Sequence, residues 1–218
     1  MSERPPYIAF EGPEACGKST QAARLADRIG AVLTRETGGT AIGSRLREIL
    51  HDTSVENLAP RAEALMTAAD RAQHIAEIVR PALDAGRSVV SDRSVYSSIA
   101  YQGYGRQLDV DEIRRLNRWG TGDIWPDAVV LLSIPDELAA DRMSRRDLDR
   151  FEAAGDAFHE RVFAGFRAMA AAEPGRWITI DASGPVDAVT NAIHTSLIER
   201  GLIERGLVGQ GLVDPAES

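Results

Sequence analysis

The stretch FEGPEACGKST, Phe10–Thr20, limits the possible folds of this chain more than any other segment. Within it, Gly12–Ser19 fits the pattern G-x-x-x-x-G-K-[ST]. The apolar run Tyr7–Phe10 precedes the motif as a strand would, and the helical pattern STQAARLADRIG, Ser19–Gly30, follows it. In such a unit the glycines let successive backbone N–H groups surround an anion, and the helix adds its positive end. The sequence therefore predicts a loop that binds the phosphates of a magnesium nucleotide.

Lys18, within this motif, is the only lysine in a chain whose lysines and arginines together number 25. An ammonium group is a compact charge on a flexible stem, whereas a guanidinium is a wide planar fork, so a tight loop accommodates lysine better. We expect Lys18 to reach the β- and γ-phosphates and the Ser19 hydroxyl to bind Mg²⁺. The residues expected around the nucleotide are Gly12, Pro13, Glu14, Ala15, Cys16, Gly17, Lys18, Ser19 and Thr20.

Short apolar runs alternate along the chain with longer segments that have helical spacing. This alternation indicates βαβ crossovers, and therefore a doubly wound α/β fold with a five-stranded parallel sheet. Such sheets bind ligands at the carboxyl ends of their strands, so the residues after each run are candidates for a site. The expected strands are Tyr7–Phe10, Ala31–Thr34, Ser88–Ser91, Ala128–Ser133 and Trp177–Ile180.

The length of 218 residues suits one domain with a large core, which we place at residues 1–200. The end of the chain differs, because Gly201–Pro215 repeats a Gly-Leu pair every five residues. That period matches neither a helix nor a strand, and frequent glycine weakens a helix. We expect residues 201–218 to form a flexible C-terminal extension.

The composition excludes several classes of function. The net charge of −8 argues against a nucleic-acid polymer as a partner. Cys16 is the only cysteine, which excludes an internal disulfide and a multi-cysteine metal site and suits a reducing compartment. No apolar run is long enough for a signal peptide or a membrane span. We therefore expect a cytoplasmic protein with no membrane partner.

Two further segments carry polar side chains that could meet a ligand. Asp92 follows the third expected strand, where it could hold Mg²⁺ through water, and Arg93 beside it could bind a second phosphate. The helical segment Pro60–Ile75 has a polar stripe at i, i+3, i+4 and i+7, which either reaches a ligand or is merely solvated. The stripe consists of Thr67, Asp70, Arg71 and His74. The neighbouring apolar face consists of Leu65, Ala69, Ala72, Ala76 and Val79.

The segment Asp141–Glu152, DRMSRRDLDRFE, interleaves arginines with carboxylates. Such a run is usually a solvated helix with surface salt bridges. In a chain with a phosphate-binding loop it has a second interpretation, because phosphoryl transfer needs cations on a segment that closes over the moving phosphate and excludes water.

The chain resembles the bacterial form of the thymidylate kinase family, through motifs that occur in order from Phe10 to about Val162. These motifs are FEGPEACGKSTQ, TRETGGT (Thr34–Thr40), EALMTAADRAQH (Glu63–His74), DRSVYSSIAYQG (Asp92–Gly103), and LDRFE followed by FHERV. The resemblance implies a nucleoside monophosphate kinase fold with a helical lid at about residues 141–155. It also implies a homodimer that uses ATP and Mg²⁺ to phosphorylate dTMP to dTDP, in dTTP biosynthesis.

The resemblance implies roles for residues on the acceptor side. Glu14 would bond the 3′-hydroxyl of the monophosphate. Arg71 and Arg93 would clamp its phosphate, with Arg47 nearby. The base would be bordered by Thr67, Ser98, Tyr101 and Gln102.

The resemblance also implies the catalytic cations. The family takes its catalytic arginine either from the phosphate-binding loop or from the lid, and the loop GPEACGKS contains none. Arg145 and Arg150 of the lid are therefore the candidates, acting with Lys18 and Arg93. Arg142 lies where the family stacks a side chain on adenine.

Two departures from the family pattern bear on the nucleobase. Thr67 stands where the family has an aromatic residue that stacks on thymine, and Ser94 replaces the aromatic residue of its D-R-[YF] motif. Tyr96 and Tyr101 are the rings that could substitute. A related pyrimidine monophosphate such as dUMP is therefore an alternative acceptor. A P-loop sensor that binds nucleotide without transfer is a second alternative, although the arginines of the acceptor clamp and the lid argue against it.

Overall fold

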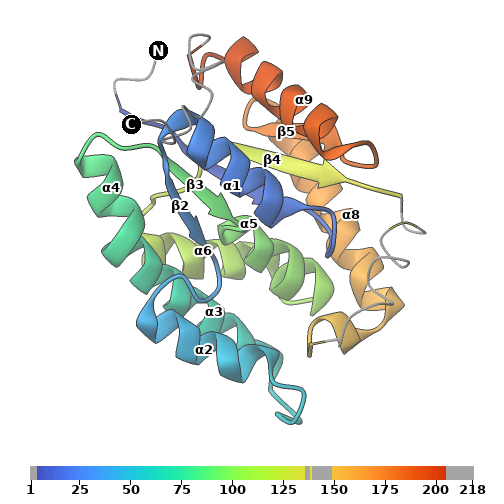
Figure 1. Cartoon of the computed structure of the whole chain (residues 1–218). Helices are drawn as coiled ribbons and strands as arrows, with labels where there is room; N and C mark the ends of the chain where they lie inside the picture. The colour runs from blue at the N-terminus through green and yellow to red at the C-terminus, as the bar shows by residue number, and fades with distance from the viewer. Residues whose placement is uncertain (1–3, 136–137, 139–148, 205–218) are drawn as a thin grey trace, which may run out of the picture.

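The computed structural model describes residues 4–135, 138 and 149–204 (Figure 1). At its centre is a five-stranded sheet in the order β2-β3-β1-β4-β5, and every pairing between neighbouring strands is parallel. The strands are β1 (Tyr7–Glu11), β2 (Val32–Arg35), β3 (Val89–Asp92), β4 (Ala128–Ser133) and β5 (Trp177–Asp181). The predicted doubly wound α/β fold is confirmed, and each expected strand is displaced by at most one residue at either end.

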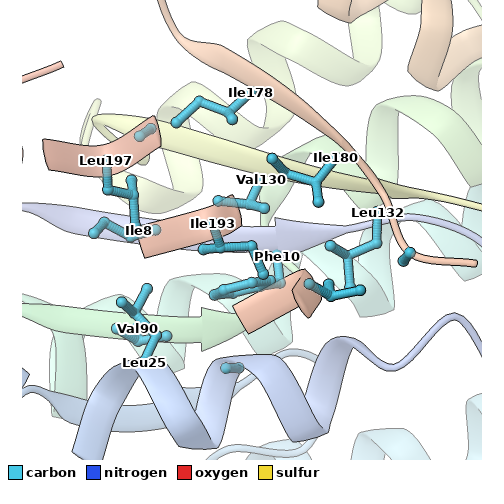
Figure 2. Close-up of a cluster of buried hydrophobic side chains, with 14 of the residues drawn as sticks. Ile8, Phe10, Leu25, Val90, Val130, Leu132, Ile178, Ile180, Ile193 and Leu197 are labelled. Atoms are coloured by element: carbon cyan, nitrogen blue, oxygen red, sulfur yellow. The ribbon is translucent and has the colours of Figure 1, made fainter. Parts of the chain in front are cut away.

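One face of the sheet is covered by α1 (Lys18–Ile29) and α9 (Val186–Glu199), which both lie in front of the strands in Figure 1. Ile8 and Phe10 of β1 point into the hydrophobic cluster that these helices close (Figure 2). Full burial of one such side chain contributes roughly 1.5–3 kcal/mol, so this face holds β1, and the loop after it, firmly in place. The helices supply Ala22, Leu25, Ala26, Val189, Ile193 and Leu197 to the cluster.

The opposite face of the sheet is covered by a second set of helices. Leu131 of β4 points to this side, whereas its neighbours Val130 and Leu132 face α1 and α9. Burial on both faces explains why β4 reads as a continuous apolar run instead of an alternating one. The covering helices are α5 (Val95–Ser98), α6 (Val110–Thr121) and α8 (Asp156–Ala172).

The other helices connect β2 to β3 or extend their neighbours. They are α2 (Ala41–His51), α3 (Pro60–His74), α4 (Arg80–Asp84), the π-helical η1 (Ile75–Val79) and η2 (Ile99–Gly105), and the 3₁₀ turn η3 (Glu152–Ala154). The π-helical segment η2 continues α5 and carries Tyr101 and Gln102. Since π-helical turns are frequent at functional sites, η2 marks this part of the chain for attention.

The polar stripe of α3 is buried, and most of its apolar face is exposed. Thr67, Asp70, Arg71 and His74 are all buried. The interpretation of the stripe as solvated is therefore wrong. Leu65 is 58% exposed, and Ala69 and Ala76 are also exposed, whereas Val79 is buried in η1. Each of these four side chains has at least one hydrogen-bonding partner, and these partners offset the cost of burial.

The last described residues continue beyond α9. Leu202 and Ile203 pack against the hydrophobic cluster of Figure 2. Residues 205–218, most of the expected extension, lie outside the described residues, as does most of the expected lid. No helix in the described part of the chain has the length and apolar character needed to cross a membrane.

Candidate active site

The loop between β1 and α1 has the backbone that its glycines predict. Gly12 and Gly17 have φ angles of 142° and 95°, a region that favours glycine. A Cβ atom on Gly12 would lie 2.5 Å from the carbonyl oxygen of Leu132, so the close approach of β4 leaves no room for a side chain. Gly17 directly precedes α1, whose first N–H groups have no partner within the helix. The strand–loop–helix unit is confirmed, and its helix terminus is suited to an anion.

Lys18 is the first residue of α1, and its ammonium group is held within the loop. Its Nζ atom donates a hydrogen bond of 2.5 Å to the carbonyl oxygen of Pro13 and lies 3.8 Å from Sγ of Cys16. Cys16 itself is buried in the cluster beneath α1. The loop therefore concentrates positive charge in a small volume at the helix terminus.

A cavity of about 610 Å³ opens at the carboxyl ends of β1, β2 and β3, where parallel sheets bind ligands. The expected site residues that line it are Glu14, Ala15, Gly17, Lys18, Ser19, Thr20, Arg47, Thr67, Arg71, Asp92, Arg93, Tyr101 and Gln102. Gly12, Pro13 and Cys16 shape the loop without lining this cavity.

Several further residues line the cavity, and none of them was expected at the site from the sequence. They are Arg35, Glu36, Thr37, His51, Ser97, Asp149, Phe151 and Glu152. All except His51 belong to motifs that carry the family resemblance, so membership of a motif was a signal that could have found them.

Asp92 at the end of β3 and Ser19 in the first turn of α1 form a pair of oxygen donors. Ser19 Oγ donates to Asp92 Oδ2 at 2.5 Å. The other oxygen, Asp92 Oδ1, is buried and accepts no hydrogen bond within the described part of the chain. Mg²⁺ takes oxygen ligands, and commonly binds to one or two protein groups, substrate phosphates and water. This hydroxyl and carboxylate, next to a phosphate-binding loop, therefore fit a magnesium ion.

Glu14, Arg93 and Tyr101 form a cluster on the cavity wall. Arg93 Nη2 pairs with Glu14 Oε1, and the Tyr101 hydroxyl donates to the same oxygen at 3.3 Å. The Arg93 guanidinium also lies 5.2 Å from the centre of the Tyr101 ring. Burial alone would raise the pKa of Glu14, but the charges of Arg93 and Lys18 outweigh burial and lower that pKa to about 2. Glu14 is therefore an anion at neutral pH.

The backbone of Arg93 takes an unusual turn immediately after β3. Its φ of 71° is left-handed, which is uncommon for a residue with a side chain. Its N–H group donates to the carbonyl oxygen of Phe10 at 2.9 Å, which ties the turn to β1. Such backbone outliers cluster at functional sites, and here the outlier belongs to a residue that lines the cavity.

Arg71 on α3 is held by α5 with its N-cap residue and by the segment that follows β2. Nη1 donates to Ser98 Oγ at 2.7 Å, and Nη2 donates to the carbonyl oxygen of Ser94 at 2.9 Å. Nε lies 2.9 Å from Glu36 Oε2, an attraction between charges whose N–H is not aligned as a hydrogen bond. Glu36 also lies 2.7 Å, through Oε1, from Nδ1 of His74. The guanidinium is therefore positioned before any ligand binds.

Thr67 lines the cavity, but its hydroxyl turns back toward the protein. Oγ1 donates to the carbonyl oxygen of Ala64 at 2.9 Å and lies 3.1 Å from Ser98 Oγ. Ser98 was expected beside the nucleobase, but it does not line the cavity. Its hydroxyl instead accepts a hydrogen bond from Arg71. Ser97 lines the cavity instead, because a helix turns successive side chains in different directions.

The two rings considered as substitutes for the missing aromatic residue have different positions. Tyr96 is buried in the core, edge-on to Trp125 and Trp177. The expectation that its ring could stack on the nucleobase is therefore wrong. Tyr101 lines the cavity. Phe151, which was not among the expected rings, also lines the cavity, with its ring centre 5.8 Å from that of Tyr101.

Arg150, expected to act as a catalyst in the lid, instead contacts α2 and α3. Its Nη2 lies 2.7 Å from Glu63 Oε2, and its Nε donates to the carbonyl oxygen of Leu50 at 2.8 Å. The preceding Asp149 lies 2.6 Å, through Oδ2, from Nδ1 of His51. Arg150 does not line the cavity, because a buried carboxylate holds its guanidinium elsewhere. Arg142 and Arg145 lie outside the described residues.

Comparison with known proteins agrees with the motifs. The model of the family described as thymidylate kinase matches residues 10–193. A thymidylate kinase of Bifidobacterium longum is 45% identical to this chain over 201 residues, covering 88% of this chain and 97% of the relative. One of Exiguobacterium sp. is 42% identical over 199 residues, covering 88% and 94%. One of Desulfovibrio desulfuricans is 45% identical over 196 residues, covering 84% and 90%. This chain therefore belongs to the thymidylate kinase family.

Proposed function

We propose that this chain transfers the γ-phosphoryl group of ATP to the phosphate of dTMP, giving ADP and dTDP. One observation carries the proposal: a single cavity is lined both by Lys18 of the phosphate-binding loop and by Arg71 and Arg93. Two sets of cations facing one space suit two phosphorylated substrates. Relatives that cover most of this chain are thymidylate kinases, which supports the same reaction.

On the donor side, the loop N–H groups and Lys18 bind the β- and γ-phosphates of ATP. Ser19 and Asp92 hold Mg²⁺, which when bound neutralises charge on those phosphates. Arg142, which lies outside the described residues, is assigned to the adenine ring by the family resemblance alone. The hydrogen bond from Lys18 to the carbonyl of Pro13 keeps the ammonium in the loop, ready for a phosphate.

On the acceptor side, Arg93 and Arg71 bind the phosphate of dTMP, with Arg47 at the rim. Glu14 is ionised and accepts a hydrogen bond from the 3′-hydroxyl of the deoxyribose. Thr67, Tyr101 and Gln102 border the base, and Ser98 acts indirectly by holding Arg71.

The phosphate of dTMP is already an anionic nucleophile, so the reaction leaves little work for a general base. The protein must align two anions and neutralise the charge between them. Lys18 and Arg93 supply two of the cations. We assign the third to Arg145 of the lid, because the phosphate-binding loop has no arginine and Glu63 holds Arg150.

Two copies of the chain form a homodimer through the exposed apolar surface of α3 and α6, which we call the α3–α6 face. Leu65 on α3 is 58% exposed and Trp119 on α6 is 86% exposed. The two helices touch closely, since a Cβ atom on Gly120 would lie 3.7 Å from Cβ of Ala72. Large apolar side chains on adjoining helices are typical of a surface that a second copy covers.

An assay of ADP release with a panel of monophosphates tests the function. We expect ATP with dTMP to give the highest kcat/KM and dTDP as the product identified by ion-exchange chromatography. A higher kcat/KM with dUMP would instead favour the related kinase. Nucleotide binding without ADP release from any mixture would favour a sensor.

A further inference from the structure

Glu63, in the first turn of α3, has no role in the reaction described above, yet several polar groups converge on it. Its side chain is fully buried and does not line the cavity. Gln102 Nε2 donates to Glu63 Oε1 at 2.9 Å. Arg106 and Arg150 reach Glu63 Oε2 at 3.1 and 2.7 Å. One buried carboxylate therefore joins η2, the residue that follows η2, and the base of the lid.

These contacts determine which way the Gln102 amide is turned. A carboxylate between two guanidinium groups can only accept hydrogen bonds, so Gln102 must present its NH₂ group to Glu63. The reverse orientation would place the amide oxygen against Glu63 Oε1, so two acceptors would face each other with no hydrogen between them. Gln102 Oε1 accepts no hydrogen bond from any residue that the structure describes. This oxygen and the second N–H of the amide are therefore left for a ligand in the cavity that Gln102 lines.

A fixed amide distinguishes two kinds of pyrimidine. Thymine and uracil present an N3–H donor beside the O4 acceptor, which matches an amide oxygen beside an amide N–H. Cytosine presents an N3 acceptor beside an amino donor, so the same amide would meet an acceptor with its oxygen and a donor with its N–H. A site built for one hydrogen-bonding pattern strongly rejects the other, because buried groups are left unpaired.

We propose that Glu63 is a positioning residue for base selectivity: by fixing the orientation of the Gln102 amide, it makes the site accept 4-oxo pyrimidine monophosphates and reject 4-amino ones. Arg106 and Arg150 both pair with Glu63 Oε2, so its buried charge keeps a cationic partner in Arg150 when Arg106 is changed. The inference rests on the proposed function, because it concerns the acceptor base of that reaction.

The variant Glu63→Gln provides the first test. A neutral amide at position 63 can donate or accept, so the Gln102 amide becomes free to turn. We expect the ratio of kcat/KM for dTMP to that for dCMP to fall at least tenfold, with most of the change in KM. Folding is checked by circular dichroism and thermal unfolding. A folded Glu63→Gln protein that keeps the wild-type ratio would overturn the proposal.

A double-mutant cycle separates positioning from a merely structural role. In a Gln102→Ala background there is no amide to orient, so Glu63→Gln should no longer alter the dTMP-to-dCMP ratio. Arg106→Gln is the matched control, because it removes a partner of Glu63 but leaves the contact with Gln102. It should preserve the ratio even where overall activity falls. A change in the ratio of the same size in the Gln102→Ala background would contradict action through Gln102.

A measurement on the wild-type chain does not depend on how the variants fold. In ¹⁵N-labelled protein, the side-chain amide signal of Gln102 is assigned by its loss in Gln102→Ala. We expect dTMP to shift this signal strongly and dCMP at the same concentration to leave it nearly unchanged. Equal shifts with both ligands would overturn the proposal. The two conclusions can fail separately: a wild-type enzyme inactive with dTMP overturns the function and this inference, whereas an active enzyme whose selectivity survives Glu63→Gln overturns this inference alone.

Discussion

The carboxylate of Asp92 lies 2.5 Å, through Oδ2, from the hydroxyl of Ser19, and this contact joins the end of β3 to the start of α1. Strands β1 and β3 are adjacent in the sheet although they are far apart in the sequence, so the end of β3 lies beside the loop and helix that follow β1. The remaining oxygen of Asp92 has no donor within the described residues, which leaves it for a ligand.

Asp92→Asn should weaken the use of Mg²⁺. The amide keeps the shape of the side chain but removes a negative charge, so we expect the Mg²⁺ concentration for half-maximal activity to rise about tenfold to a hundredfold. A magnesium titration of ADP release measures it. Asp187→Asn, at an exposed surface pair with Arg24, is the control and should behave as wild type. An unchanged titration curve in Asp92→Asn would remove this residue from the site.

The two lid arginines should differ in the kind of defect they cause. Arg145→Ala should lower kcat by about 10³-fold while KM for dTMP changes little, because its cation acts in the transition state. Arg150→Ala should lower the free energy of unfolding by about 1–3 kcal/mol, because it removes a partner of the buried Glu63. Steady-state kinetics and urea unfolding of both variants measure these effects. A loss of kcat in Arg150→Ala as large as in Arg145→Ala, in a stable protein, would restore Arg150 as a catalyst.

Thr67→Phe should improve the binding of dTMP. Thr67 lines the cavity without a ring, and stacking of an aromatic side chain on a base contributes roughly 1–3 kcal/mol. We expect KM for dTMP to fall about tenfold to a hundredfold with little change in kcat, because a stack adds uniform binding. Kinetics with dTMP and dUMP test it. A rise in KM for both would mean that Tyr101 or Phe151 already occupies the space.

Glu14 should stabilise the fold in a way that depends on pH. Its pKa falls from 4.5 in the unfolded chain to about 2 in the fold, so its contribution is present above about pH 4.5 and is lost as the pH falls toward 2. The shift corresponds to about 3 kcal/mol at neutral pH. Urea unfolding at several pH values should show the stability difference between wild type and Glu14→Gln shrinking as the solution is acidified. A difference independent of pH would contradict this linkage.

Leu65→Arg should dissociate the proposed homodimer. A charge placed within the α3–α6 face has no partner in the proposed interface, so we expect the dimer dissociation constant to rise at least about tenfold. Light scattering after size-exclusion chromatography measures it at several concentrations. Val186→Arg is the matched control, because Val186 is 47% exposed but belongs to α9, on the opposite face of the sheet. A wild-type chain that is monomeric at every concentration would reject the interface.

The sheet and the loop could be predicted because their signals are local. The loop motif Gly12–Ser19 can be identified from the segments directly before and after it, and each strand is a short apolar run. The same reasoning left two interpretations of α3 open, because burial there depends on partners far away in the sequence. Arg71 and His74 are buried because Glu36 follows β2 and meets them there. No periodicity within α3 contains that information.

The site residues also fall into two groups, those that local sequence places and those whose position depends on distant partners. Lys18 and Asp92 could be placed from the sequence because each follows directly from a loop or a strand end. The side chain of Arg150 could not, since its direction depends on a carboxylate in the first turn of α3. Gln102 was expected beside the nucleobase. The proposed role of Glu63 in orienting the Gln102 amide can be inferred only from the contact between η2 and α3.

Lys18 is the sole lysine, and its ammonium is held against the carbonyl of Pro13 with only 6% of the residue exposed. All other side-chain positive charge comes from arginine and histidine, so the exterior carries no side-chain primary amine. Within this sequence, amine-directed chemistry therefore has two targets, the α-amino group and Lys18. A dye or surface linker applied to the ATP-loaded enzyme at mild pH would attach once, at the end of the chain. The molecule is thus suited to oriented immobilisation and single-site labelling without an engineered handle.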